Sequence, residues 1–247
     1  MCIIAVKKTG QKMFPEETIR MMFDNNPDGA GIMWYDLPRK KVGYRKGFMK
    51  LEQLMEFING RDWTNTAVVM HFRIGTSGHK TKLCTHPYPV YDKNHVSGFT
   101  DIAVCHNGVL SNYFPGYNSA INDSLNFTQK VLSKLQPSFI RDKDKLMLIE
   151  ELIGTSKLAF IDDSGDITLL GDFIEDDGYI YSNRSYLPKK PKASYSFNSR
   201  NYYPSNLFGQ WDDDDDKMDE EPLKSPDHYF DITEETGYQG ETGDYAY

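Results

Sequence analysis

Hydrophobic and polar positions divide the chain into strand-like and helix-like segments that occur in clusters. Segments rich in aliphatic and β-branched residues predict buried strands: CIIAV at 2–6, TAVVMHFRI at 66–74, DIAVCHNGV at 101–109 and KLAFIDDSGDITLLG at 157–171. The last of these predicts a hairpin that turns at Asp163, Ser164 and Gly165.

Apolar residues at helical spacing predict helices over 15–25, 50–59, 122–135 and 142–153. Pro15, followed by Glu16 and Glu17, is typical of a helix start. Because helices and strands cluster and do not alternate strictly, the pattern favours a layered α+β domain over a doubly wound α/β domain.

Composition narrows the classes of protein that fit. A 28.4 kDa chain with 39% hydrophobic residues can bury a sizeable core, and a net charge of −8 disfavours bulk attraction to nucleic acid or anionic membranes. No apolar run reaches the roughly 18 residues that a membrane-spanning helix needs. Three cysteines, and a start without a secretory pattern, predict a soluble protein in a reducing, cytoplasmic compartment.

Charge is distributed unevenly and predicts a boundary near residue 190. Residues 191–247 carry 4 basic and 14 acidic residues, a charge of −10, so residues 1–190 come to about +2. The segment 191–247 has little aliphatic periodicity but seven tyrosines, which predicts a disordered, acidic C-terminal tail after a folded domain at 2–190. This tail is either a solvated extension without a specific role or a docking segment for a basic partner surface.

Cys2 directly follows the initiator methionine. Once Met1 is removed, the α-amine of Cys2 lies beside its own thiol, and an α-amine titrates at about 7.7–8.0, low enough to accept the thiol proton near neutral pH. One residue would then supply nucleophile and base. Taken alone, however, position 2 favours a small hydrophobe at the start of a buried strand.

Two polar phrases, HFRIGTSG at 71–78 and CHNGVLSN at 105–112, overlap the ends of predicted strands. In the second, the Asn107 amide and the Gly108 backbone N–H are donors suited to a developing oxyanion, although Asn-Gly alone favours a hairpin turn. In the first, Arg73 before Gly-Thr-Ser-Gly suits a carboxylate, although a surface arginine is equally expected.

Cysteines and histidines also suggest a metal site, which the spacing disfavours. Cys84, His86, Cys105 and His106 offer four zinc ligands, but closed structural sites usually separate paired ligands by two to four residues. Strand alternation also predicts that Cys105 and His106 point to opposite faces. His71 is expected to be a structural residue near the end of its strand.

Taken together, the motifs resemble the class II glutamine amidotransferase domain of the N-terminal nucleophile hydrolases. The resemblance rests on Cys2 and on five later phrases in order: NPDGAGIMWY at 26–35, HFRIGTSG, THPYP at 85–89, CHNGVLSN and NDS at 122–124. It covers most of residues 2–185. It implies a layered αββα sandwich, glutamine as substrate and no cofactor or metal.

The resemblance also implies roles for individual residues. Cys2 would attack the glutamine side-chain amide with its α-amine as base, and Asn107 and Gly108 would form the oxyanion hole. Arg73 would bind the substrate α-carboxylate and Asp123 its α-ammonium. Thr76, in the turn after Arg73, would be a supporting contact.

Two positions depart from the family pattern: Ile3 replaces the usual glycine after the cysteine, and Leu125 replaces the usual glutamate of the acidic motif. The 57 residues after 190 are too few and too polar to form an ammonia-consuming domain. The sequence therefore predicts a stand-alone subunit that passes ammonia to a separate acceptor protein. The alternatives are an N-terminal-cysteine hydrolase of γ-glutamyl or other small amides, and a non-catalytic binding module on the same fold.

Overall fold

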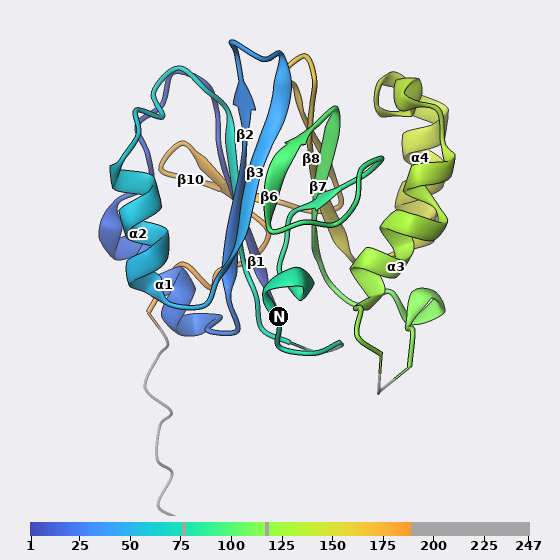
Figure 1. Cartoon of the computed structure of the whole chain (residues 1–247), viewed down its shortest axis with the longest axis horizontal. Helices are drawn as coiled ribbons and strands as arrows, with labels where there is room; N and C mark the ends of the chain where they lie inside the picture. The colour runs from blue at the N-terminus through green and yellow to red at the C-terminus, as the bar shows by residue number, and fades with distance from the viewer. Residues whose placement is uncertain (76–77, 117–118, 189–247) are drawn as a thin grey trace, which may run out of the picture. The chain divides into compact units, whose positions relative to one another are not determined.

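The fold is a four-layer αββα sandwich, in which two β-sheets face each other and helices cover the outer side of each (Figure 1). The computed structural model describes residues 1–75, 78–116 and 119–188. The predicted α+β class is confirmed, and the layering agrees with the expected sandwich. The predicted acidic tail at 191–247 lies outside the described residues and stays a prediction.

Every neighbouring strand pair in the two sheets is antiparallel. In the described chain, the first sheet has the order β10 (Ile174–Asp176), β11 (Tyr179–Tyr181), β1 (Ile3–Lys7), β4 (Val68–Phe72), β2 (Ala30–Asp36), β3 (Lys41–Phe48) and β6 (Ser97–Thr100). The second sheet has the order β5 (Tyr88–Pro89), β7 (Ile102–Asn107), β8 (Lys157–Asp162) and β9 (Ile167–Leu170).

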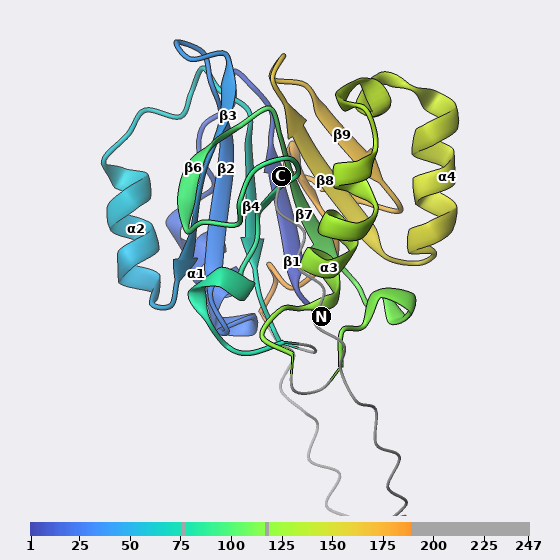
Figure 2. The same cartoon turned by 45° about the vertical axis from the view of Figure 1, so that its right-hand side comes forward.

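Helices α1 (Glu16–Asn25) and α2 (Leu51–Asn59) cover the first sheet, and α3 (Asp123–Lys130) and α4 (Lys143–Ile153) cover the second (Figure 2). A strand that lies between a helix layer and the facing sheet can therefore be apolar on both faces. In β1, Ile3 and Ala5 pack in the core under α1 and α2, whereas Ile4 and Val6 pack between the sheets. This double burial explains why the strands appear in the sequence as continuous apolar runs and not as alternating patterns.

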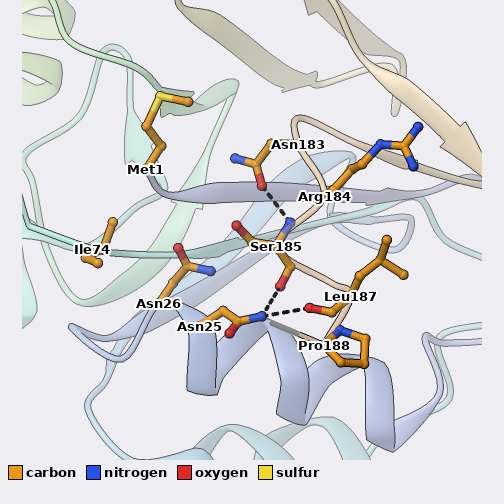
Figure 3. A pocket seen from close by; sticks show the side chains of 9 residues that line it. All are labelled: Met1, Asn25, Asn26, Ile74, Asn183, Arg184, Ser185, Leu187 and Pro188. Atoms are coloured by element: carbon orange, nitrogen blue, oxygen red, sulfur yellow. Dashed lines mark hydrogen bonds between the residues drawn. The ribbon is translucent and has the colours of Figure 1, made fainter. Parts of the chain in front are cut away.

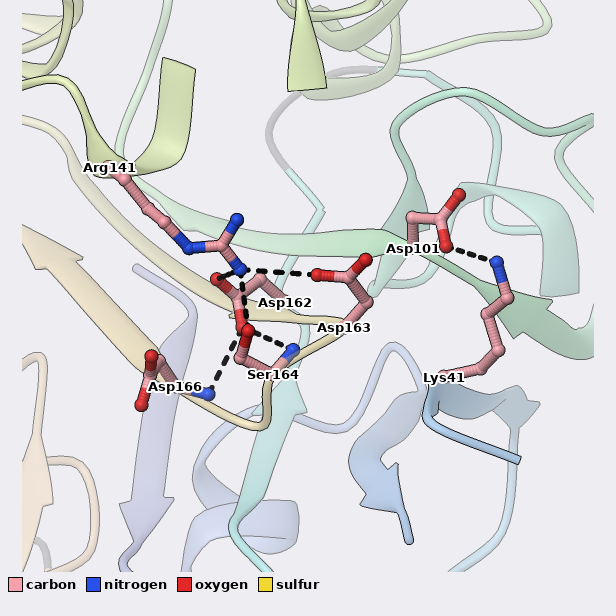
Figure 4. Close-up of polar contacts among 7 residues, drawn as sticks. All are labelled: Lys41, Asp101, Arg141, Asp162, Asp163, Ser164 and Asp166. Atoms are coloured by element: carbon pink, nitrogen blue, oxygen red, sulfur yellow. Dashed lines mark hydrogen bonds and ion pairs between the residues drawn. The ribbon is translucent and has the colours of Figure 1, made fainter. Parts of the chain in front are cut away.

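The hairpin between β8 and β9 turns at the predicted residues (Figure 4). The Asp162 carboxylate accepts hydrogen bonds from the backbone N–H of Ser164 and of Asp166, and its other oxygen lies 2.9 Å from an Arg141 guanidinium nitrogen. Gly165 has φ +84°, which favours glycine at this position. Buried Asp162 is therefore satisfied by the turn that it organises, and the prediction is confirmed.

Two departures from the predicted elements have local causes. Strands β2, β3, β5, β6, β10 and β11 are not among the predicted strands. In β3, glycines and charges interrupt the apolar pattern; a Cβ at Gly43 would lie 2.5 Å from the ring of Trp34. The predicted helix over 122–135 ends at Lys130, where Val131 is the C-cap and donates its N–H to the Phe127 carbonyl oxygen, and a short 3₁₀ helix at Leu132–Lys134 follows. The other three helices lie within one residue of their predicted bounds.

Among the described residues, no helix is long and apolar enough to cross a membrane.

Candidate active site

Cys2 lies immediately before β1 and beside Ile74, two residues after the end of β4. Its thiol can donate to the Ile74 carbonyl oxygen, and the Ile74 N–H can donate to its sulfur, with both separations 3.4 Å. Burial raises the pKa of the Cys2 thiol, against the opposing effects of the Ile74 N–H and the nearby Arg73 charge. A thiol with a raised pKa is protonated at neutral pH and needs a base to become a nucleophile.

Four of the six predicted site residues line one small cavity of about 20 Å³: Cys2, Arg73, Gly108 and Asp123. They come from separate parts of the chain: before β1, after β4, after β7 and the start of α3. The remaining lining residues are Ile74, His86, His106, Asn122 and Ser124. The strand ends of both sheets therefore bring the predicted thiol, cation and anion together at one edge of the sandwich.

Arg73 and Asp123 provide opposite charges at this cavity, and both are buried. The Asp123 carboxylate accepts hydrogen bonds from the Leu110 N–H (2.8 Å) and the Ser124 N–H (2.9 Å), which fix its orientation at the start of α3. A Cβ at Gly75 would lie 3.1 Å from an Arg73 guanidinium nitrogen, so the loop passes directly over the guanidinium. The pair suits a zwitterionic ligand, which needs one cation and one anion close together.

The loop after Arg73 is anchored by Asp28, which belongs to the NPDGAGIMWY phrase but was assigned no role from the sequence. The Gly75 N–H donates to one Asp28 carboxylate oxygen at 2.8 Å, and Lys80 pairs with the other at 2.7 Å. Burial alone would raise the pKa of Asp28, but the Gly75 N–H and Lys80 together lower it below its ordinary value. Thr76, the predicted supporting contact in this loop, lies outside the described residues.

Asn107 is buried at the end of β7, where its amide faces Ser182. Asn107 Nδ2 lies 2.8 Å from Ser182 Oγ, which also accepts the Ile4 N–H at 2.8 Å, while Asn107 Oδ1 has no partner among the described residues. Rotating the amide by 180° lets the Ser182 hydroxyl donate to Oδ1 and leaves Nδ2 as the unpaired donor. The rotated amide satisfies the hydroxyl proton and retains a donor for an oxyanion.

Gly108 has φ +149° and cannot carry a side chain without a clash. A Cβ there would lie 2.2 Å from Ser156 Oγ and 2.8 Å from Ser156 Cα. The chain after β7 continues into a short 3₁₀ helix at Ser111–Tyr113 and then α3, so Asn-Gly does not form the turn of a hairpin with the next strand. The glycine is required for the close approach of the backbone to the segment before β8.

Replacing Gly108 with alanine is expected to lower the rate of amide hydrolysis at least about 100-fold, because the backbone N–H moves with the clash. Overpacking costs about 1–3 kcal/mol, so the melting temperature should also fall by several degrees. Gly154→Ala is the matched control, since Gly154 has φ +56° but open space around its Cβ position. Steady-state kinetics and thermal melts measure both; normal turnover in Gly108→Ala would remove this N–H from the mechanism.

Residues 182 and 183 contribute to the site although no motif indicates them. Pairing of β11 with β1 carries the chain beyond Tyr181 past Cys2, where Asn183 Nδ2 donates to the Cys2 carbonyl oxygen at 2.6 Å. Ser182 in turn bonds the Ile4 backbone through both its N–H and its Oγ. These contacts fix the backbone of the proposed nucleophile, and only knowledge of the strand pairing could have found them.

A larger cleft of about 480 Å³ adjoins the small cavity, and Ile74 lines both (Figure 3). Met1 lies at this cleft with 74% of its surface exposed. On the opposite wall Asn25 donates to the carbonyl oxygens of Ser185 and Leu187. Arg184 also lines the cleft and gives it a positive charge. An aminopeptidase can therefore approach Met1 from solvent.

The predicted zinc alternative gains no support. Among the described residues, no three or more His, Cys, Asp or Glu side chains are arranged to hold a metal ion. Cys105 packs between the sheets, whereas His106 lines the small cavity, so the two side chains point to opposite faces as strand alternation predicts.

Comparison with known proteins gives weak similarities of structure. No protein-family model and no curated protein matches the chain. Among solved structures, the chain is similar to glutamine phosphoribosylpyrophosphate (PRPP) amidotransferase from B. subtilis, in complex with ADP and GMP, with a TM-score of 0.44 and 15% identity. A structure described as the allosteric regulatory enzyme of purine biosynthesis gives 0.45 and 16%. Each match covers 73% of this chain and 41% of the other.

Proposed function

We propose that this protein is a class II type glutamine amidotransferase subunit, which hydrolyses the side-chain amide of glutamine and passes ammonia to a separate acceptor protein. The observation that carries the proposal is the cavity that Cys2, Arg73, Gly108 and Asp123 line together. Motifs that are individually weak supply a nucleophile, a backbone donor, a cation and an anion within one site.

The reaction begins when the α-amine of Cys2, freed by removal of Met1, takes the thiol proton. The sulfur attacks the amide carbon of glutamine, and the oxyanion is stabilised by the Asn107 amide and the Gly108 N–H. The C–N bond then breaks, the amine proton goes to the leaving nitrogen, and ammonia departs. Water cleaves the remaining thioester to give glutamate and the free thiol.

Substrate selection falls to the charged pair. Arg73 binds the α-carboxylate of glutamine in a bidentate manner, with Thr76 as an additional contact, and Asp123 binds the α-ammonium. A free amino acid offers a charge to each of them, whereas an uncharged amide of similar size offers neither. A reducing cytoplasmic compartment suits this chemistry, because it keeps the Cys2 thiol free.

Replacing Arg73 with lysine is expected to raise KM for glutamine about tenfold, with kcat changed much less. Lysine keeps the charge but loses the planar fork that grips a carboxylate. The measurement is steady-state ammonia release over a range of glutamine concentrations. The control is Arg20→Lys, which makes the same change at an exposed arginine. An unchanged KM in Arg73→Lys would mean that Arg73 does not hold the carboxylate.

The cleft at Met1 favours a second candidate function, hydrolysis of a γ-glutamyl amide with a larger amine. The cleft of about 480 Å³ has the volume of a small-molecule site and adjoins Cys2 through Ile74. Comparison of glutamine with γ-glutamyl anilide and γ-glutamyl amino acids tests this. A kcat/KM higher for the larger amides than for glutamine would favour the hydrolase over the ammonia-producing subunit.

A further inference from the structure

Three histidines are buried next to the Cys2 cavity: His71 on β4, His86 in the segment before β5 and His106 on β7. The ring centroids of His71 and His86 are 4.1 Å apart, and those of His86 and His106 are 6.3 Å apart. Each of the three is at most 3% exposed. None of the three has a role in the reaction steps proposed above.

These rings have more hydrogen-bonding atoms than partners. His71 Nε2 lies 3.0 Å from the His106 carbonyl oxygen, and His106 Nδ1 lies 2.7 Å from Ser124 Oγ. His71 Nδ1, His106 Nε2 and both nitrogens of His86 have no partner among the described residues. Burial lowers the pKa of His71 to about 3 and of His106 to about 4, so the rings are neutral. A neutral imidazole has one donor and one acceptor nitrogen.

Packing holds His86 in place in spite of this cost. A Cβ at Gly31 would lie 1.9 Å from the His86 carbonyl oxygen, so the glycine admits the His86 backbone against β2. The Tyr88 ring stacks at a tilt on the His86 ring with centroids 4.5 Å apart, and Lys46 donates to the Pro87 carbonyl oxygen at 2.9 Å. A polar ring fixed this firmly without partners needs a ligand, because native interiors rarely leave such groups unsatisfied.

The cavity that His86 and His106 share with Cys2 has room for one water molecule. Its volume of about 20 Å³ exceeds the roughly 10–15 Å³ that a single water requires. Cys2, His86 and His106 all line this cavity, so a water bound in it would have the thiol and two imidazoles as neighbours. Both of its hydrogen-bonding capacities are met, since neutral imidazoles donate and accept.

We propose that His86, with His71 and His106 beside it, binds and orients the water that hydrolyses the thioester on Cys2. This role rests on the proposed function, because it concerns the second half of that reaction. The water oxygen forms a bond with the acyl carbon, and the C–S bond breaks. One water proton reaches the Cys2 sulfur through the α-amine, and the other leaves with the carboxylic acid, so atoms and electrons balance.

The test is His86→Phe in the processed full-length protein, which keeps the ring shape and removes both nitrogens. First-turnover ammonia release should stay within about threefold of the wild type, since acylation does not use this water. Steady-state glutamate release should fall at least about tenfold, and a glutamyl adduct on Cys2 should accumulate in the intact mass. Hydroxylamine, which replaces water as nucleophile, should restore turnover as γ-glutamyl hydroxamate.

Controls separate this role from a structural one. His95→Phe changes an exposed histidine and should leave every readout unchanged. If His86 were only structural, His86→Phe would be neutral or stabilising and would keep the wild-type ratio of hydrolysis to hydroxamate formation, which would overturn the inference. His86→Gln, which retains a donor and an acceptor, serves if the phenylalanine variant does not fold, and the same ratio decides. A wild-type protein that neither forms the adduct nor hydrolyses glutamine overturns the proposed function itself.

Discussion

Cys2→Ala is expected to lower glutamine hydrolysis at least about 10⁴-fold, because the substitution removes the atom that forms the covalent bond. The fold should stay intact, since the hydrogen bonds of the thiol among the described residues are two weak sulfur contacts with the Ile74 backbone. Ammonia and glutamate release at saturating glutamine measure the effect. Intact mass must first show that Met1 is absent from both proteins, because a retained methionine blocks the α-amine.

The control for this variant is Cys105→Ala. Cys105 is fully buried between the two sheets, and burial raises its pKa far above the usual range, so it is an inert thiol. Its loss should lower stability modestly and leave kcat unchanged. Full turnover in Cys2→Ala would remove Cys2 as nucleophile and would mean that a different residue is the catalytic one.

Asn107→Ala is expected to lower kcat about 10²–10³-fold with a small change in KM, because an oxyanion donor acts only in the transition state. Ser182 Oγ keeps the hydrogen bond from the Ile4 N–H after the substitution, so the strand pairing that positions Cys2 persists. The amide atom of Asn107 that has no partner among the described residues disappears with the side chain, which limits the cost to stability. Steady-state kinetics together with a thermal melt separate the two effects.

Asn126→Ala is the matched control, since Asn126 is also a buried asparagine and its Nδ2 donates to the Tyr113 carbonyl oxygen at 2.7 Å. It should lose stability but keep kcat, the reverse of Asn107→Ala. Equal losses of kcat in both variants would show that the Asn107 effect comes from general destabilisation and not from the oxyanion hole.

Local pattern was sufficient to predict strands β1, β4, β7, β8 and β9 and three helices within one residue, because continuous apolar runs and amphipathic segments are local signals. It did not reveal β2 and β3, where Gly43 is required by the nearby Trp34 ring, a contact between strands. It also extended α3 beyond Lys130, since the chain continues there as a short 3₁₀ helix in which the apolar spacing goes on. These errors arise where tertiary packing overrides local preference.

The candidate site likewise contains residues that the sequence could predict and residues that it could not. Arg73 and Gly108 stand at or just beyond the ends of apolar strands, so their place at the sheet edge follows from pattern, and both line one cavity with Cys2. Asn183 and the orphaned nitrogens of His86 could not be foreseen, because they depend on which strands are neighbours and on what fills the space between sheets. The role of Asn183 follows from its hydrogen bond to the Cys2 backbone, and that of His86 from burial without partners among the described residues; one sequence shows neither.

The central claim is that a processed Cys2 with a free α-amine attacks a glutamine-shaped substrate. The most direct test is intact mass of the purified protein before and after incubation with 6-diazo-5-oxo-norleucine, followed by peptide mapping. The account predicts a protein without Met1 that gains one adduct, located on Cys2. Processed protein that gains no adduct on Cys2, under conditions where a known glutaminase is fully labelled, would contradict it.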